Sequence, residues 1–177
     1  TMPLKFWNDR NDNKFKDAYF NRFSNIWHHG DFAEIKKTRG FVIHGRSDTT
    51  LNPGGVRLGT AEIYSEVEKF KEIKESLVVG QSWDNDVRVV LFVVMNTKFL
   101  LSENLLKKIK IQIRKNASPR HVPSKVIVVK DIPKTKSGKI VELAVKNKLE
   151  GNKIKNIEAL ANPKALEQFK NLKELNN

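Results

Sequence analysis

The stretch "DVRVVLFVVMN", residues 86–96, carries the strongest fold signal in the chain. It is an almost continuous run of β-branched and apolar residues, which is the pattern of a strand buried on both faces. Two further runs, "ESLVVGQS" at 75–82 and "SKVIVVKD" at 124–131, also favour strands. A strand buried on both faces needs cover above and below, so the sequence predicts a sheet with other elements packed on it.

Helical patterns lie on both sides of these strands. Apolar residues recur at helical spacing in three segments, 60–70, 102–116 and 141–151. The residues of these stripes are Ile63, Val67, Phe70, Leu106, Ile109, Ile113, Val141, Val145 and Leu149. Thr60 and Ser102 stand where N-caps are expected. The order from residue 60 is therefore helix, strand, strand, helix, strand, helix, which predicts an α+β fold with a small central β-sheet flanked by helices.

A last helix is predicted over "NPKALEQFKNLKEL", residues 162–175. Asn162 would be its N-cap, and Pro163 suits its first turn. Its apolar stripe would consist of Leu166, Phe169 and Leu172.

The N-terminal part has a different character. Residues 19–45 favour short strands joined by turns. The stretch "GRSDTTLNPGGVRLG" at 45–59 holds four glycines and a proline, and is the strongest loop signal in the chain. It is either a linker or a hairpin.

Composition excludes several classes of protein. The 177 residues contain no cysteine, which excludes disulfides and thiolate metal sites. No apolar run approaches the ~20 residues of a membrane span, and the polar start lacks the middle of a signal peptide. A soluble, cytoplasmic protein is expected. The chain opens on "TMP", and its first part has little periodicity, so we interpret it as a piece of a longer chain.

The net charge of +13 favours polyanionic partners, either nucleic acid, an anionic membrane or phosphorylated small molecules. The lysines are scattered, and aromatic residues do not alternate with them, which argues against a groove for single-stranded nucleic acid. Two alternatives stay open at this point: a solvated lysine-rich surface, and a basic, non-enzymatic nucleic-acid-binding module.

The segment "KTKSGK", residues 134–139, invites comparison with the nucleotide phosphate loop G-x-x-x-x-G-K-[ST]. The comparison fails, because Pro133 stands at the first glycine position and Ile140 replaces the magnesium-binding hydroxyl. Lys139 still suits the stabilisation of phosphoryl or carboxylate charge in a dry site. The alternative is a surface lysine at a helix start, where a positive charge opposes the helix dipole.

Other polar residues allow two readings each. Arg46 suits two-point recognition of a phosphate or carboxylate, whereas Asp48 suits an Asx-turn. Asp31 is a turn former or an acceptor for two ribose hydroxyls. His28 and His29 lack a nearby third ligand, so no metal site is predicted.

Three blocks taken together resemble one family. "HGD" at 29–31, "GRSDTTLNPGGVRLGTAEI" at 45–63 and "PKTKSGKI" at 133–140 are similar, in sequence and spacing, to the C-terminal part of acyl-CoA synthetases in the adenylate-forming superfamily. "YFNRFSNIWHHGD" and "RHVPSKV" narrow the resemblance to the branch that activates acetoacetate, with Pro119 as a small departure.

The resemblance implies a reaction in two halves. A carboxylate, here acetoacetate, reacts with ATP to give an acyl-adenylate and pyrophosphate, and coenzyme A then displaces AMP. Mg²⁺ would be held by a large N-terminal domain. The resemblance assigns residues 1–47 to the β-rich end of that domain and residues 48–177 to a small C-terminal domain that rotates between the halves. Acetate, propionate or another short acid is the alternative substrate.

Site residues follow from the matched blocks. For adenylation the resemblance implies that Asp31 binds the ribose hydroxyls, Arg46 contacts the nucleotide phosphate and Lys139 is catalytic. Asp48 would be the hinge. The loop that carries Lys139 would be mobile, because the positive charge of Lys139 enters the active site for adenylation and leaves it for thioester formation.

The thioester half involves other residues. The resemblance places Gly55 beside the pantetheine of coenzyme A and Arg114 near the phosphates of coenzyme A. Arg57, in the same loop as Gly55, is assigned to the nucleotide. The partners implied are ATP, coenzyme A, the acid and the protein's own N-terminal domain, with no nucleic acid and no membrane. The isolated chain is expected to fold without synthetase activity.

Overall fold

A computed structural model describes residues 2–154 and 156–176. The chain divides into two compact units, Thr1–Asp31 and Phe32–Asn177, which are treated separately below.

The first unit contains α1 (Asn13–Tyr19), a helix that the sequence patterns did not reveal. The carboxylate of Asp9 accepts backbone N–H groups from Lys14 and Phe15 at 3.2 and 2.9 Å, which satisfies free donors of the first turn. Phe15 packs against Tyr19 with ring centroids 5.3 Å apart. Local capping and aromatic packing thus replace the longer apolar stripe on which a helix prediction depends.

The second unit is built on the predicted sheet. Its three strands are β3 (Ile73–Trp83), β4 (Asp86–Met95) and β5 (Lys125–Val128), in the order β3-β4-β5. β3 and β4 pair antiparallel, whereas β4 and β5 pair parallel. β4 is therefore the central strand, as its continuous apolar sequence predicts.

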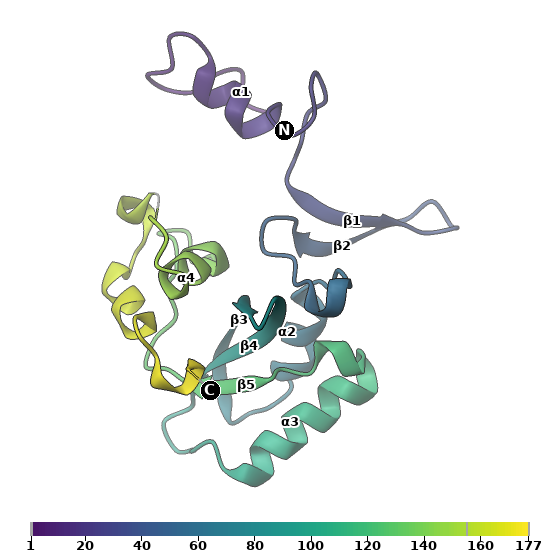
Figure 1. Cartoon of the computed structure of the whole chain (residues 1–177), viewed down its shortest axis with the longest axis vertical. Coiled ribbons are helices and arrows are strands. Elements are labelled where there is room, and N and C mark those ends of the chain that lie inside the picture. The colour runs from purple at the N-terminus through teal and green to yellow at the C-terminus, as the bar shows by residue number, and fades with distance from the viewer. Residues whose placement is uncertain (1, 155, 177) are drawn as a thin grey trace. The chain divides into compact units, whose positions relative to one another are not determined.

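Helices lie between and after these strands in the predicted order. They are α2 (Ala61–Val67), α3 (Glu103–Asn116) and α4 (Glu142–Leu149). In Figure 1, α3 lies on one side of the sheet, and α4 lies on the other side with the yellow C-terminal segment. The α+β prediction of a small sheet flanked by helices is confirmed.

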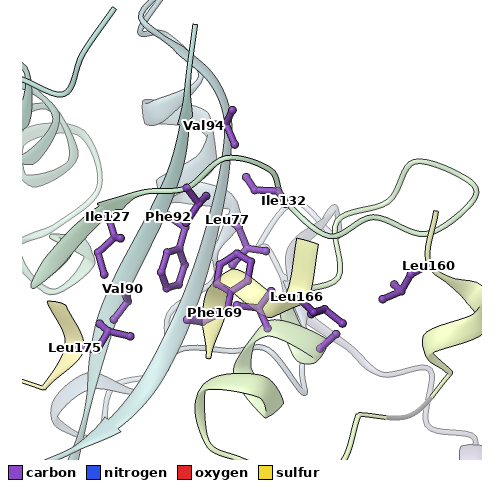
Figure 2. Packing of buried hydrophobic residues seen from close by; sticks show 14 residues of the cluster. Leu77, Val90, Phe92, Val94, Ile127, Ile132, Leu160, Leu166, Phe169 and Leu175 are labelled. Carbon is purple, nitrogen blue, oxygen red and sulfur yellow. The ribbon is translucent and has the colours of Figure 1, made fainter. Parts of the chain in front are cut away.

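Each face of the sheet has its own core, because neighbouring strand residues point to opposite faces. Leu91 and Val93 of β4 pack with α2 and α3, whereas Val90 and Phe92 pack with α4 and the C-terminal segment. Figure 2 shows the second of these cores, with Phe92 and Phe169 facing each other. Their ring centroids are 4.9 Å apart, in an edge-to-face arrangement.

The segment before α2 forms a second small sheet and a hairpin-like loop. β1 (Asp31–Ile35) and β2 (Phe41–Arg46) form a two-stranded sheet. Within 45–59, Leu51 and Leu58 exchange two backbone hydrogen bonds of 3.0 and 2.9 Å around the 3₁₀ turn η1 (Pro53–Gly55). The loop is thus a hairpin rather than an open linker.

Of the three predicted caps, Thr60, Ser102 and Asn162, only Ser102 is confirmed. The side chain of Ser102 accepts the backbone N–H of Leu105 at 3.2 Å at the start of α3. Thr60 has a helical backbone conformation and makes no side-chain cap bond, so its assignment as a cap was wrong. α2 also ends at Val67, which leaves Phe70 beyond the helix but still packed on the core.

The predicted last α-helix was wrong. The C-terminal segment consists of 3₁₀ turns, η3 (Ile157–Ala159), η4 (Pro163–Phe169) and η5 (Lys173–Leu175); a further 3₁₀ turn, η2 (Pro119–His121), precedes β5. The apolar residues predicted for this helix, Leu166, Phe169 and Leu172, are nevertheless buried or partly buried against the sheet. Asn162 makes no cap bond at η4. Among the described residues, no helix has the length and apolar character needed to cross a bilayer.

Candidate functional site

Lys139 lies at the end of a tight loop rather than at a helix start, since α4 begins at Glu142. Thr135 N–H donates to the carbonyl of Lys139 at 2.8 Å, and Lys139 N–H donates to Thr135 Oγ1 at 3.1 Å. Gly138 has a φ of +82°, a left-handed backbone conformation that residues with a Cβ rarely adopt. The loop thus fixes the backbone of Lys139 while its side chain stays exposed, with no hydrogen-bond partner among the described residues.

The first arm of this loop is attached to the sheet. Lys134 Nζ donates to Glu75 Oε1 of β3 at 2.7 Å, and both side chains are partly buried. A pocket of about 290 Å³ lies here, lined by the start of β3 together with Gly138 and Ile140. The Lys139 loop therefore sits at the N-terminal end of β3.

A buried hydroxyl holds the start of α4. Tyr64 of α2 donates its O–H to Glu142 and accepts the backbone N–H of Val78 at 3.0 Å. Burial, followed by the neighbouring charge of Glu142, raises the pKa of Tyr64 well above its usual 10.0. The neutral hydroxyl therefore joins α2, β3 and α4 three residues after Lys139.

The predicted hinge and phosphate-contacting residues lie together. Arg46 donates from Nε and Nη2 to the two oxygens of Asp48, at 3.3 and 3.2 Å. The carbonyl of Arg46 also accepts the hydroxyls of Thr49 and Thr50, at 3.3 and 3.0 Å. Asp48 is therefore an ion-pair partner of Arg46 within an ordered turn.

Asp31 belongs to the first unit. One of its carboxylate oxygens lies 2.5 Å from His29 Nδ1, and about a quarter of its side chain is exposed. This contact orients the carboxylate, which is an acceptor suited to hydroxyl groups.

Gly55 lies in a loop at the other end of the β3–β4 hairpin. The backbone N–H of Gly54 donates to both carboxylate oxygens of Asp86, at 2.9 and 3.0 Å. An open pocket of about 660 Å³ is lined by Asn52, Gly55 and the 82–87 turn. A side chain at Gly55 would meet no atom within 4 Å, although φ is +76°. The backbone of Gly55 is thus open to the approach of a slender ligand.

Arg57 and Arg114 are exposed on separate elements. Arg57 lies directly before the Leu51–Leu58 bridge, and Arg114 lies in the last turn of α3. Neither makes a hydrogen bond or ion pair with any of the described residues, and no contact joins them to Lys139. The structure therefore brings Arg46 and Asp48 together and keeps Gly55 and Arg57 in one loop, but leaves Arg114 on α3 and Lys139 in a loop of its own.

Sequence reasoning missed the residues that support the Lys139 loop. Glu75, Asn162 and Gln168 contact residues 130–134 from positions far along the chain. No local pattern identifies them, since Asn162 before a proline has the sequence of an ordinary cap.

Within the described part of the chain, no group of three or more histidine, aspartate or glutamate side chains is arranged so that it could hold a metal ion. Carboxylates fit Mg²⁺, but those of Asp48 and Glu62 are each paired with a basic side chain, Arg46 and His44. The described residues thus do not form a site for this ion.

Comparison with known proteins gives one domain match and several similar synthetases. Residues 62–139 match the AMP-binding enzyme C-terminal domain. The chain is 59% identical, over 99% of its length, to an acetoacetyl-coenzyme A synthetase of Rhizobium meliloti (strain 1021), and 49% identical, over its whole length, to an acetoacetyl-CoA synthetase of Xenopus tropicalis.

A solved structure, acetoacetyl-CoA synthetase from Streptomyces lividans, is 41% identical and superposes with a TM-score of 0.86 over 95% of this chain and 26% of that one. The chain spans about a quarter of the length of these relatives, 27% of both curated proteins. On these grounds residues 62–139 belong to the family of AMP-binding enzyme C-terminal domains, and the chain as a whole is similar to part of the acetoacetyl-CoA synthetases.

Proposed function

We propose that the chain is the C-terminal part of an ATP-dependent ligase that joins acetoacetate to coenzyme A through an acyl-adenylate. The relatives that match along nearly the whole chain carry the name of this activity. Within this proposal, residues 1–47 end the large domain and residues 48–177 form the mobile one.

One observation carries the proposal. The Lys139 loop lies beside Glu75, near the start of β3, whereas the Gly55 loop lies beside Trp83, at its end. Eight residue-to-residue steps along the strand, from Glu75 to Trp83, separate these positions by about 26 Å. A single orientation of the domain therefore presents only one of the two loops to a given site, as a reaction in two halves requires.

In the first half, a carboxylate oxygen of acetoacetate bonds to the α-phosphorus of ATP, and pyrophosphate leaves. Asp31 would hold the ribose hydroxyls, Arg46 a phosphate, and the charge of Lys139 would stabilise the negative charge that develops at the α-phosphate. Arg57 would remain near the nucleotide. Because Arg46 is paired with Asp48, its contact with a phosphate would compete with this pair.

In the second half, the thiol sulfur of coenzyme A bonds to the acyl carbon, AMP leaves, and the thiol gives up its proton. Gly55 would let the pantetheine pass close to the backbone, and Arg114 would attract the phosphates of coenzyme A. Rotation of residues 48–177 about Asp48 would replace the Lys139 loop by the Gly55 loop at the active site. We assign the Mg²⁺ that accompanies ATP to ligands outside the described residues, and the enzyme to the cytoplasm.

A substrate panel on the full-length enzyme tests the proposal. ATP-dependent formation of the acyl-CoA is measured with acetoacetate, acetate and propionate, with AMP and pyrophosphate as the second readouts. Preference for acetoacetate by at least about tenfold in kcat/KM, or about 1.4 kcal/mol, is expected. Preference for acetate or propionate would overturn the choice of acid, and release of ADP and phosphate would overturn the adenylate route.

A further inference from the structure

The C-terminal segment 156–176, called the tail below, contacts the Lys139 loop directly. It lies outside the region that matches the AMP-binding enzyme C-terminal domain, which ends at residue 139. The matches to the relatives nevertheless extend over 99–100% of the chain. The tail thus lies beyond the matched domain segment but within the region shared with these relatives, and its contacts show what it supports.

The backbone of the tail pairs with the first arm of the loop. Ala161 N–H donates to the carbonyl of Lys134 at 2.8 Å, and Lys136 N–H donates to the carbonyl of Ala159 at 3.0 Å. Between them, Thr135 and Leu160 form an antiparallel bridge. Since Thr135 in turn holds the backbone of Lys139, the tail continues the ladder that fixes the catalytic lysine.

The side chain of Asn162 completes this support with three hydrogen bonds. Its Oδ1 accepts the N–H of Lys134 at 2.8 Å, and its Nδ2 donates to the carbonyl of Ile132 at 2.9 Å and to Asp131 Oδ2 at 2.6 Å. One half-buried amide therefore satisfies polar groups of three residues at the base of the loop.

The tail itself is fixed by the core. Phe169 and Leu166 are buried, with Phe169 packed edge-to-face on Phe92 of β4. Gln168 adds hydrogen bonds to Lys130 N–H and to the carbonyl of Asp131, at 2.8 and 2.6 Å. The position of Asn162 is thus set by the sheet, and Asn162 transmits this position to the loop.

We propose that the tail positions the Lys139 loop for adenylation, and that Asn162 is the positioning residue. The inference rests on the proposed role of Lys139. A lysine has a long flexible stem, so the backbone at its base decides which volume its ammonium group can reach. A misplacement of about 1 Å lowers a rate by up to about 100-fold. Thioester formation uses the opposite end of the hairpin and does not need this support.

The test uses the full-length enzyme and measures its two half-reactions separately. Adenylation is followed as pyrophosphate formation from ATP and acetoacetate, and thioester formation as acyl-CoA produced from supplied acyl-adenylate. For Asn162→Ala we expect adenylation kcat to fall by about 10- to 100-fold, with KM for ATP changed less than about threefold. Thioester formation should stay within about twofold of the parent.

Two further variants keep the test decisive. Asn162→Ser keeps a small polar side chain and, unlike an aspartate, adds no carboxylate beside Asp131, so a loss of adenylation no larger than that of Asn162→Ala is expected; it decides the matter if Asn162→Ala does not fold. Glu167→Gln weakens the 2.7 Å ion pair between the tail and Lys148 without touching the loop, and should leave both half-reactions unchanged.

The outcomes separate the two proposals. Normal adenylation by a folded Asn162 variant, or equal loss of both half-reactions, overturns the positioning role while leaving the proposed function intact. Normal adenylation by Lys139→Ala instead overturns the catalytic role proposed for Lys139, and the positioning role with it, whereas failure of the parent enzyme to adenylate acetoacetate overturns the proposed function itself.

Discussion

At the scale of single residues, Lys139 combines a fixed backbone with an exposed side chain. Its N–H and carbonyl are both bonded to Thr135, at 3.1 and 2.8 Å. A surface lysine without a function gains little from such restraint, because its charge remains in water. The restraint suits a charge that must arrive at a defined point.

Substitution of Lys139 should therefore separate the half-reactions. In the full-length enzyme we expect Lys139→Ala to lower the adenylation rate by about 100- to 1,000-fold, while thioester formation from supplied acyl-adenylate is spared. Lys136→Ala, which removes an exposed lysine from the same loop, is the matched control and should change neither rate. Equal loss of both halves in Lys139→Ala would exclude a role in one step only.

Glu66 is a second informative residue. This nearly buried carboxylate of α2 accepts hydrogen bonds from Asn116, Gln112 and Lys69, at 2.8, 3.0 and 2.6 Å. The bond from Asn116, then that from Lys69, holds the pKa of Glu66 below its usual 4.5. Glu66 thereby links α2 to α3.

Glu66→Gln should destabilise the chain by about 1–2 kcal/mol at neutral pH, since an amide cannot accept all these bonds. A lowered folded-state pKa means that the contribution of Glu66 is complete above about pH 4.5 and is lost as the pH falls through the folded-state value. Thermal unfolding from pH 7 to pH 3 should show the parent and variant converging in acid. A constant difference, or the same effect from exposed Glu68→Gln, would contradict this assignment.

At the scale of elements, the start of α3 can be tested through its cap. Ser102→Ala should cost about 1 kcal/mol and lower the Tm by about 2–4 °C, because the N–H of Leu105 loses its acceptor. Ser102→Asp keeps an acceptor and should retain most of the stability in thermal unfolding. If Ser102→Asp lost as much as Ser102→Ala, the stability would not come from the cap.

The strands and the helices α2, α3 and α4 were predictable, because burial imposes clear periods on their sequences. The tail was not. Its buried apolar residues are spaced by three, which is the period of a 3₁₀-helix rather than that of an α-helix. These residues are Leu166, Phe169, Leu172 and Leu175. Asn171, at φ +54°, interrupts the turns between them.

The candidate site also has a part that the sequence predicts and a part that it does not. The short blocks around Asp48 and Lys139 identify the loops by themselves, since each is contiguous in sequence. The residues that hold these loops are distant: Glu75 lies 59 positions from Lys134, and Asn162 lies 28 positions from it. Such contacts depend on how the sheet and tail pack, which a single sequence does not encode locally.

At the scale of the whole molecule, contacts across the proposed hinge define the present orientation of β2 and α2. His44 Nδ1 lies 2.8 Å from Glu62 Oε1, which joins the segment before Asp48 to the segment after it. Gly59 permits the approach, because a Cβ there would lie 2.3 Å from the carbonyl of His44. Rotation about Asp48 would have to separate these groups.

Asp48→Pro should accordingly impair one half-reaction more than the other. Proline fixes φ at the pivot, so we expect thioester formation to fall by at least about tenfold more than adenylation in the full-length enzyme. Asp48→Ala, which removes the ion pair with Arg46 but leaves φ free, is the control. An unchanged thioester rate in Asp48→Pro would count against a hinge at this position.

The β3–β4 hairpin has a consequence beyond the core that it forms. Its length sets the span between the two loops, and strands can change length without turning their side chains over only in steps of two residues. Removing one such step from each strand would bring the loops closer by about 7 Å while both cores kept their faces. The length of the hairpin thus determines the distance between the two loops. In relatives that keep this mechanism, the lengths of β3 and β4 should differ from those here only by even numbers of residues.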